Sequence, residues 1–180
     1  FRFEVGRSAV LEYFPEPTIP YTGSLLSSAV RFDLAEGAVL LYADILCPGR
    51  THRGECFKYN TVDACMEVYR CGRPIAWDHF RLTPAIHDYR ATGALEDYTH
   101  IGTFWAFADQ ADERLISRIR NILPAENPSS LIAGASLAPE GGLSVRMLGR
   151  SAWELQSLCH AIWAVCRSEL LDLPPCMLRK

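Results

Sequence analysis

The sequence predicts a mainly β domain with two helices gathered toward its C-terminal end. Apolar and polar residues alternate through most of the first two-thirds of the chain, which is the period of a half-buried strand. Two later stretches repeat their apolar residues at helical spacing instead. Strands that precede the helices, rather than alternating with them, favour a sheet-based core with appended helices. The length of 180 residues fits one domain.

Short strands are predicted one after another along the first part of the chain. Residues 1–5 already have strand character, so we expect further strands to lie upstream of them. Residues 30–34 alternate, whereas residues 38–46 form a more continuous apolar run that suits a strand buried on both faces. The other predicted features are strands around Phe57 and Tyr59, around Met66 and Val68, around Ile75, Trp77 and His79, over residues 101–107 and over residues 143–147, a turn at Cys71-Gly72-Arg73-Pro74, and a loop over residues 125–130.

Two helices are predicted from their spacing and their end signals. The first covers residues 109–123, and Pro124 ends it because proline cannot continue the hydrogen-bonding pattern. The second covers residues 152–171. Ser151 and Glu154 form an S-x-x-E capping box at its start, which indicates where that helix begins.

Composition excludes several classes of protein. The net charge of −3 argues against nucleic acid as the main partner. No run of eighteen apolar residues is present, so no membrane span is predicted. Seven cysteines without a C-x-x-C pair disfavour a disulfide framework, and reduced thiols in the cytoplasm are the better interpretation.

The sequence contains no recognisable catalytic or cofactor motif. There is no G-x-S-x-G elbow, no G-x-G-x-x-G or phosphate loop, and no H-x-x-x-H pair. The cysteine spacings match no structural zinc pattern. We therefore expect no enzymatic activity and no stably bound cofactor, and the metal ligands, if there are any, stay unassigned. Folding can bring together a cysteine and a histidine that are distant in the sequence. A thiol- or histidine-dependent hydrolase therefore remains one alternative function.

The most distinctive polar segment is the run PGRTHRGE over residues 48–55, which lies between apolar stretches. The simpler interpretation is a polar turn between two strands, with glycines supplying positive φ. The alternative is a contact surface or a polar lining, because two arginines, a histidine and a glutamate are concentrated there.

Four short motifs follow one another along the chain. The first is LEYFPEPTIPY over residues 11–21, and the fourth is VRMLG over residues 145–149. In order and spacing, the set resembles the UreD/UreH family of urease accessory proteins over nearly the whole chain. The residues between and after these two motifs that carry the resemblance are Gly49, Arg50, Arg53, Gly54, Glu55 and Phe57, then Arg70, Cys71, Gly72, Arg73, Asp78, Arg81, Leu82 and Pro84, and finally Trp163, Arg167, Leu178, Arg179 and Lys180.

The resemblance implies β-solenoid-like layered strands with two α-helices near the C-terminus, in a single domain over residues 1–180 that lacks the family's N-terminal strands. It implies a non-catalytic scaffold or conduit for nickel delivery during maturation of the urease metallocentre. The implied partners are a UreF-like accessory protein, a UreG-like GTPase and apo-urease, in the cytoplasm. Nickel would be in transit through an internal channel rather than stably bound. The positions implied for an interface or a channel are Glu12, Pro15, Pro17, Thr18, Gly49, Arg50, Arg53, Gly54, Glu55, Arg146, Arg167 and Arg179.

One alternative function has the same fold but no role in metal delivery. A β-rich protein-binding module unrelated to metal delivery would have the same strand pattern, because fold alone does not define function. Co-purification with a UreF-like protein, or a neighbouring urease operon, distinguishes the accessory role from this alternative.

Overall fold

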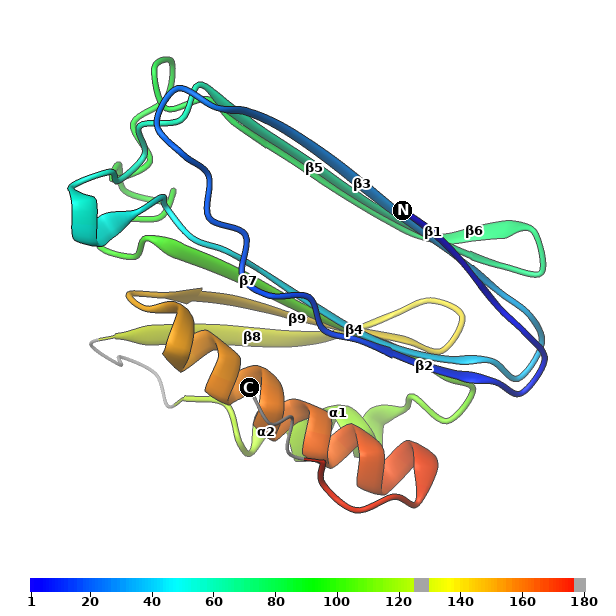
Figure 1. Cartoon of the computed structure of the whole chain (residues 1–180). Coiled ribbons are helices and arrows are strands. Elements are labelled where there is room, and N and C mark those ends of the chain that lie inside the picture. Colours follow the sequence, from blue (N-terminus) through cyan, green and yellow to red (C-terminus); the bar gives the residue numbers. More distant parts are fainter. Residues whose placement is uncertain (125–129, 177–180) are drawn as a thin grey trace.

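The computed structural model describes residues 1–124 and 130–176, which form two packed β-sheets with two helices on one side (Figure 1). One sheet has four strands in the order β1-β3-β5-β6, and the other has five in the order β2-β4-β7-β9-β8. We call them the first and the second sheet. The elements are β1 (Arg2–Val5), β2 (Val10–Tyr13), β3 (Leu25–Leu34), β4 (Val39–Leu46), a 3-10 turn (Thr51–Arg53), β5 (Thr61–Arg70), β6 (Arg73–Leu82), β7 (His100–Phe107), α1 (Glu113–Arg120), β8 (Leu131–Ala138), β9 (Gly142–Gly149) and α2 (Ala152–Leu171).

The first five strands alternate between the two sheets. As a result β1, β3 and β5 pair in parallel in the first sheet, and β2 and β4 pair in parallel in the second. The later pairings are antiparallel, and β5 and β6 form a hairpin around the predicted turn. The mainly β fold with two helices is confirmed. The solenoid-like description is not confirmed, because the strands form two open sheets and neither sheet is curled or closed.

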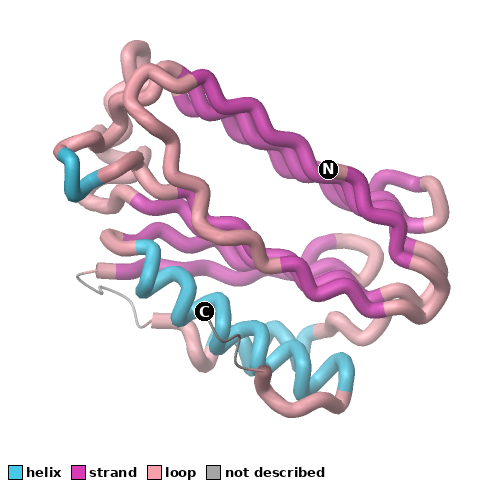
Figure 2. Tube along the Cα trace, viewed as in Figure 1, coloured by secondary structure: helices cyan, strands magenta, loops and turns pink. Residues whose placement is uncertain are grey.

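Apolar side chains fill two spaces, one on each side of the second sheet. Phe32, Leu40 and Phe107 pack between the two sheets. Leu41 and Phe104 point to the opposite face, where α1 and α2 cover the second sheet (Figure 2). The strand β4 is therefore buried on both faces, as its continuous apolar run predicts.

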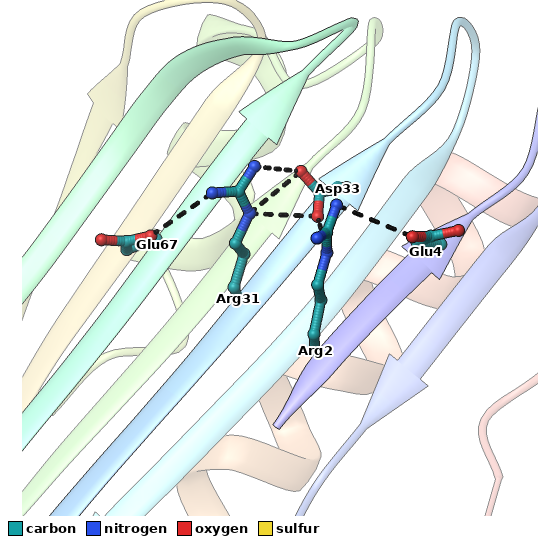
Figure 3. A network of polar contacts seen from close by, with 5 residues as sticks. All are labelled: Arg2, Glu4, Arg31, Asp33 and Glu67. Carbon is teal, nitrogen blue, oxygen red and sulfur yellow. Dashed lines mark hydrogen bonds and ion pairs between the residues drawn. The ribbon is translucent and has the colours of Figure 1, made fainter.

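The outer face of the first sheet carries charged residues, and neither of the two described helices covers it (Figures 1 and 3). Arg2 and Arg31 both contact Asp33, at 2.7 and 2.8 Å. Glu4 and Glu67 extend this network at 3.6 and 4.0 Å. The hydrogen bond from Arg31 holds the pKa of Asp33 below its usual value. Opposite charges on adjacent strands thus attract one another on the solvent-exposed face.

The two helices lie where they are predicted, although the first is shorter. Helix α1 starts at Glu113 rather than at residue 109, because the Asp112 side chain accepts hydrogen bonds from two backbone N–H groups of its first turn. Helix α2 has its predicted bounds, and the Ser151 hydroxyl accepts a hydrogen bond from the Glu154 N–H at 3.3 Å.

The structure differs from the sequence prediction at one predicted strand and at two strands that were not predicted. The strand around Phe57 and Tyr59 is wrong, because these residues lie in a loop where Phe57 has a φ of 54°. Strands β2 and β8 were not predicted. The first is only four residues long, and the second is rich in alanine and glycine, which have low strand propensity. Most of the loop predicted over residues 125–130 lies outside the described residues.

Candidate functional site

A cavity of about 150 Å³ lies between the two sheets. Its walls include residues from β3, β5 and β6 of the first sheet and from β4 and β7 of the second. Pro15 and Thr18 border it near β2, and Asp78 borders it on β6. The volume holds several water molecules. The lining combines apolar side chains with hydroxyl groups and two carboxylates, and these polar groups decide what the cavity can bind.

Asp44 is the single charged residue of the buried strand β4, and it borders this cavity. Burial raises the pKa of its carboxyl group, and the negative charge of Asp78 adds to the shift. The backbone N–H of Ile45 and the hydroxyl of Tyr42 donate hydrogen bonds that act in the opposite direction. The cavity therefore has a carboxylate whose negative charge is only partly compensated by neutral donors.

A proline-containing segment makes room for this arrangement. Strand β2 pairs with β4 up to Tyr13, and the pairing resumes only where Thr18 lies beside Leu46. Pro15 and Pro17 lie between these points and have no N–H to donate. Because the chain leaves β4 there, the Ile45 N–H donates to the Asp44 carboxylate, and Pro15 becomes part of the cavity wall.

At the Asp78 end, the cavity is bordered by an ion pair between the two sheets. Arg146 of β9 contacts Asp78 of β6, with 2.8 Å between the guanidinium nitrogen and the carboxylate oxygen. The Asp78 side chain is 14% exposed and the Arg146 side chain 51% exposed. The guanidinium also lies 5.4 Å from the ring centre of Trp105. Arg146, a predicted site residue, thus reaches the cavity through Asp78.

Two other predicted residues meet outside the cavity, between β2 and α2. Arg167 contacts both carboxylate oxygens of Glu12, at 2.5 and 2.7 Å. The indole N–H of Trp163 donates to the same carboxylate. This cluster joins β2 of the second sheet to helix α2.

The segment over residues 48–55 forms a compact loop with its own ion pair. Arg50 binds Glu55 through two hydrogen bonds of 2.7 and 2.6 Å, and it stacks over the Tyr21 ring at 4.2 Å. The hydrogen bonds from Arg50 hold the pKa of Glu55 below its usual value. Gly49 has a φ of 130°, and a Cβ there would lie 2.5 Å from the Glu55 carbonyl oxygen, so the loop needs glycine at this position.

The remaining predicted positions are spread between these groups. Arg53 is exposed at the end of the 3-10 turn, and Gly54 follows it in the left-handed conformation. Pro17 and Thr18 line an apolar groove that Arg50 also borders. Arg179 lies outside the described residues.

Most of the predicted positions therefore lie in three separate clusters rather than in one site, and Asp44 was not among them. A signal for Asp44 was present, because it is the one charge in the apolar run of residues 38–46. Asp78 was identified only as part of a family motif.

The described residues contain no group of three or more histidine, cysteine, aspartate and glutamate side chains that could hold a metal ion. Burial raises the pKa of Cys47 to about 11 and those of Cys159 and Cys166 to about 12. These thiols stay protonated at neutral pH, which makes them poor nucleophiles and poor metal ligands. His79 instead contacts Asp63 on the outer face of the first sheet, at 2.8 Å.

Comparison with known proteins decides the family. A sequence model of the UreD urease accessory protein family matches residues 1–180. The chain belongs to the UreD family of urease accessory proteins. The resemblance predicted from the four motifs is thereby confirmed.

Curated UreD proteins of archaea and bacteria are similar to this chain along most of its length. The urease accessory protein UreD of Haloarcula marismortui is 34% identical over 171 residues, which cover 94% of this chain and 56% of that protein. UreD of Bacillus sp. (strain TB-90) is 30% identical over 92% of this chain and 60% of its own length. UreD of Staphylococcus aureus (strain Newman) is 25% identical over 99% of this chain and 64% of its own length.

This UreD-family chain thus spans about three-fifths of the length of these curated relatives. The family is one of accessory proteins and not of urease catalytic subunits. Over residues 1–124 and 130–176, no helix has the length and the apolar character that crossing a membrane requires.

Proposed function

We propose that this UreD-family protein acts in urease maturation as a scaffold and a conduit that passes nickel toward the metallocentre of apo-urease. Family membership supports the role in maturation. The observation that best supports the conduit is the inter-sheet cavity, which Asp44 and Asp78 border. Nickel is the cargo of this process and not a resident cofactor.

The chemistry of the cavity suits a cation in transit. Carboxylate oxygens that are partly withdrawn from water attract cations more strongly than fully exposed ones, because the local dielectric constant is lower. Two carboxylates without a third histidine, cysteine or acidic ligand give a weak site, as judged over the described residues. Passage requires binding that is strong enough for the ion to enter and weak enough for it to leave.

Protonation is coupled to cation passage in this proposal. The raised pKa of Asp44 means that its carboxylate is held in an unfavourable charged state when no cation is near. A divalent cation relieves that state, and any proton held by Asp44 is released as the metal binds.

The scaffold part of the proposal concerns exposed apolar side chains near the loop over residues 48–55. Ile19, Tyr21 and Leu25 are 49%, 58% and 77% exposed, and all three line the groove bordered by Arg50. Exposed apolar surface of this kind favours protein contacts. We assign the partners as a UreF-like accessory protein, a UreG-like GTPase and apo-urease in the cytoplasm, without nucleic acid or membrane.

The test replaces the cavity carboxylates in a cell that makes urease. Asp44→Asn and Asp78→Asn are expected to lower both urease activity and the nickel content of purified urease. Glu36→Gln is the matched control, because Glu36 is a surface carboxylate paired with Arg7 and its side chain is 70% exposed. Full activation by both cavity variants would refute the conduit.

The same cells test the alternative of a β-rich binding module without a role in metal delivery. If that alternative holds, deletion of the gene leaves the nickel content of urease unchanged. Urease that is made but lacks nickel after the deletion supports the accessory role.

A further inference from the structure

The two cavity carboxylates differ in what neutralises them. Asp44 accepts hydrogen bonds from neutral groups, the Tyr42 hydroxyl and the Ile45 N–H. Asp78 instead has a full positive charge beside it, because the Arg146 guanidinium lies 2.8 Å from its carboxylate. A cation that travels along the cavity therefore meets one available carboxylate and one that is already paired.

Resting on the proposed function, we propose that Arg146 is a tethered cation that closes the Asp78 end of the inter-sheet cavity and is displaced when a divalent cation reaches Asp78. Arg146 and the passing cation compete for the same carboxylate. Arg146 would then determine which cations pass. The cavity would be closed at this end while the ion pair between Arg146 and Asp78 is formed.

Burial explains why the carboxylate needs a resident partner. The Asp78 side chain is 14% exposed, and an isolated carboxylate at this burial is costly unless a positive charge or several donors compensate it. Arg146 supplies that charge from the facing sheet. Without a cation in the cavity, the ion pair is the favourable state, and it holds β6 and β9 together at this end.

The surroundings of Arg146 allow it to leave. Its side chain is 51% exposed, so the guanidinium can be rehydrated at small cost when the ion pair breaks. The ring of Trp105, 5.4 Å from the guanidinium carbon, is a second favourable contact through a cation–π interaction. The released arginine thus keeps one partner while Asp78 binds the ion.

Charge then discriminates between cations. At equal distance, an ion of charge +2 interacts twice as strongly with a carboxylate as the guanidinium or a sodium ion does. The charge of Asp78 is felt at Asp44, so the two carboxylates together attract a divalent cation more strongly than either one alone. Monovalent ions do not have this advantage, so they leave the Arg146–Asp78 pair closed.

The direct test follows Arg146 by NMR in the purified protein with arginine labelled with ¹⁵N. Zn²⁺ is the probe because it is divalent and diamagnetic, and the spectrum of Arg146→Lys assigns the Nε–H signal of Arg146. We expect a saturable shift of this signal with Zn²⁺, no shift with a large excess of Na⁺, and loss of the Zn²⁺ response in Asp78→Asn. Zn²⁺ binding that leaves the Arg146 signal unmoved would overturn the inference.

A calorimetric test uses Ni²⁺ alone. Arg146→Gln removes the competing charge and is expected to tighten Ni²⁺ binding about fivefold, which corresponds to a half-exposed ion pair of about 1 kcal/mol. Arg146→Lys keeps the charge and should stay near the wild-type affinity. Arg150→Gln is the matched control, because Arg150 is 50% exposed and pairs with Asp97 at 3.3 Å.

The outcomes separate this inference from the function on which it rests. If Asp44→Asn and Asp78→Asn lower urease activation but Arg146→Gln leaves the Ni²⁺ affinity unchanged, Arg146 is not a competing cation and the conduit stands. If the two carboxylate variants activate urease fully, the conduit itself fails. Tighter binding in Arg146→Gln together with the Zn²⁺ shift supports the tethered cation.

Discussion

Arg167 of α2 and Glu12 of β2 lie 155 positions apart in the sequence, yet one Arg167 nitrogen contacts both Glu12 carboxylate oxygens at 2.5 and 2.7 Å. Their side chains are 14% and 20% exposed, so this ion pair is largely buried. Trp163 donates to the same carboxylate from one turn earlier on α2. The three residues hold the C-terminal helix against the first strand of the second sheet.

Loss of this buried pair should be costly. Arg167→Ala leaves the Glu12 carboxylate buried without its positive partner, and we expect a loss of about 3 kcal/mol in the free energy of unfolding. Arg118→Ala is the control, since its ion pair with Glu169 is half exposed on the Arg118 side and is expected to contribute less than about 1 kcal/mol. Urea denaturation measures both. Equal losses of unfolding free energy in the two variants would show that the Glu12–Arg167 pair stabilises the protein no more than the more exposed pair does.

Substitutions in and next to helix α2 compare how much core packing and helix capping contribute to stability. Leu158→Ala should cost roughly 2–5 kcal/mol, because Leu158 is buried in the core between α2 and the second sheet. Ser151→Ala should cost about 1 kcal/mol through the lost cap. Trp153→Ala, at a side chain on the same helix that is 74% exposed, should change stability little. A Leu158→Ala variant as stable as the wild type would mean that this side chain faces a partner, and binding to the proposed UreF-like partner should then weaken.

The loop over residues 48–55 should matter for activation more than for folding. Arg50→Ala and Glu55→Ala each break the doubly hydrogen-bonded pair, and we expect lower urease activation with an unchanged circular dichroism spectrum. Lys58→Ala is the matched control, because Lys58 is an exposed cation just after the same loop and is not one of the positions implied for an interface or a channel. Wild-type activation by both pair variants would return this segment to the interpretation as a polar turn.

Removal of the charge should change the stability of the protein in opposite directions at Asp44 and at Asp33. Burial raises the pKa of Asp44 in the folded protein, so ionised Asp44 lowers stability once the pH rises through that value. Asp44→Asn should therefore raise the urea midpoint at pH 7, and the gain should shrink below about pH 4, the pKa of an unfolded aspartate. Asp33→Asn should lower the midpoint at pH 7, because Arg31 depresses the pKa of Asp33 and that stabilisation is lost only as the pH falls. A lower midpoint for Asp44→Asn at pH 7 would contradict the burial argument.

The thiols should fall into reactive and protected classes. Cys71 and Cys176 are exposed and should react with a thiol reagent at pH 8 in the native protein. Cys159 and Cys166 are buried with pKa values of about 12, so they should react only after unfolding. Timed labelling with mass spectrometry distinguishes the classes. Fast labelling of Cys159, or a catalytic activity that depends on it, would revive the thiol hydrolase as an alternative.

The sequence predicts those elements whose signal is local. The alternation of residues 30–34, the apolar run of residues 38–46 and the Ser151 cap each depend on neighbouring residues, and each is found in the structure. The pairing of Asp78 with Arg146 depends on how β6 and β9 of different sheets face each other, and no spacing in the sequence encodes that arrangement. The family motifs include Arg146, Glu12, Arg167 and Arg50, but the motifs did not indicate that these residues lie at a cavity, at a helix contact and in a loop.

The contact between Glu12 and α2 also constrains how the protein is made. β2 is synthesised long before Trp163 and Arg167, so the part of the second sheet that α2 covers stays exposed until α2 has been made. Contacts between such distant segments close late, and partly formed sheets with exposed apolar faces associate readily. Docking of α2 is therefore a late step in the folding of this chain, and it covers an apolar surface through which partly folded chains would associate.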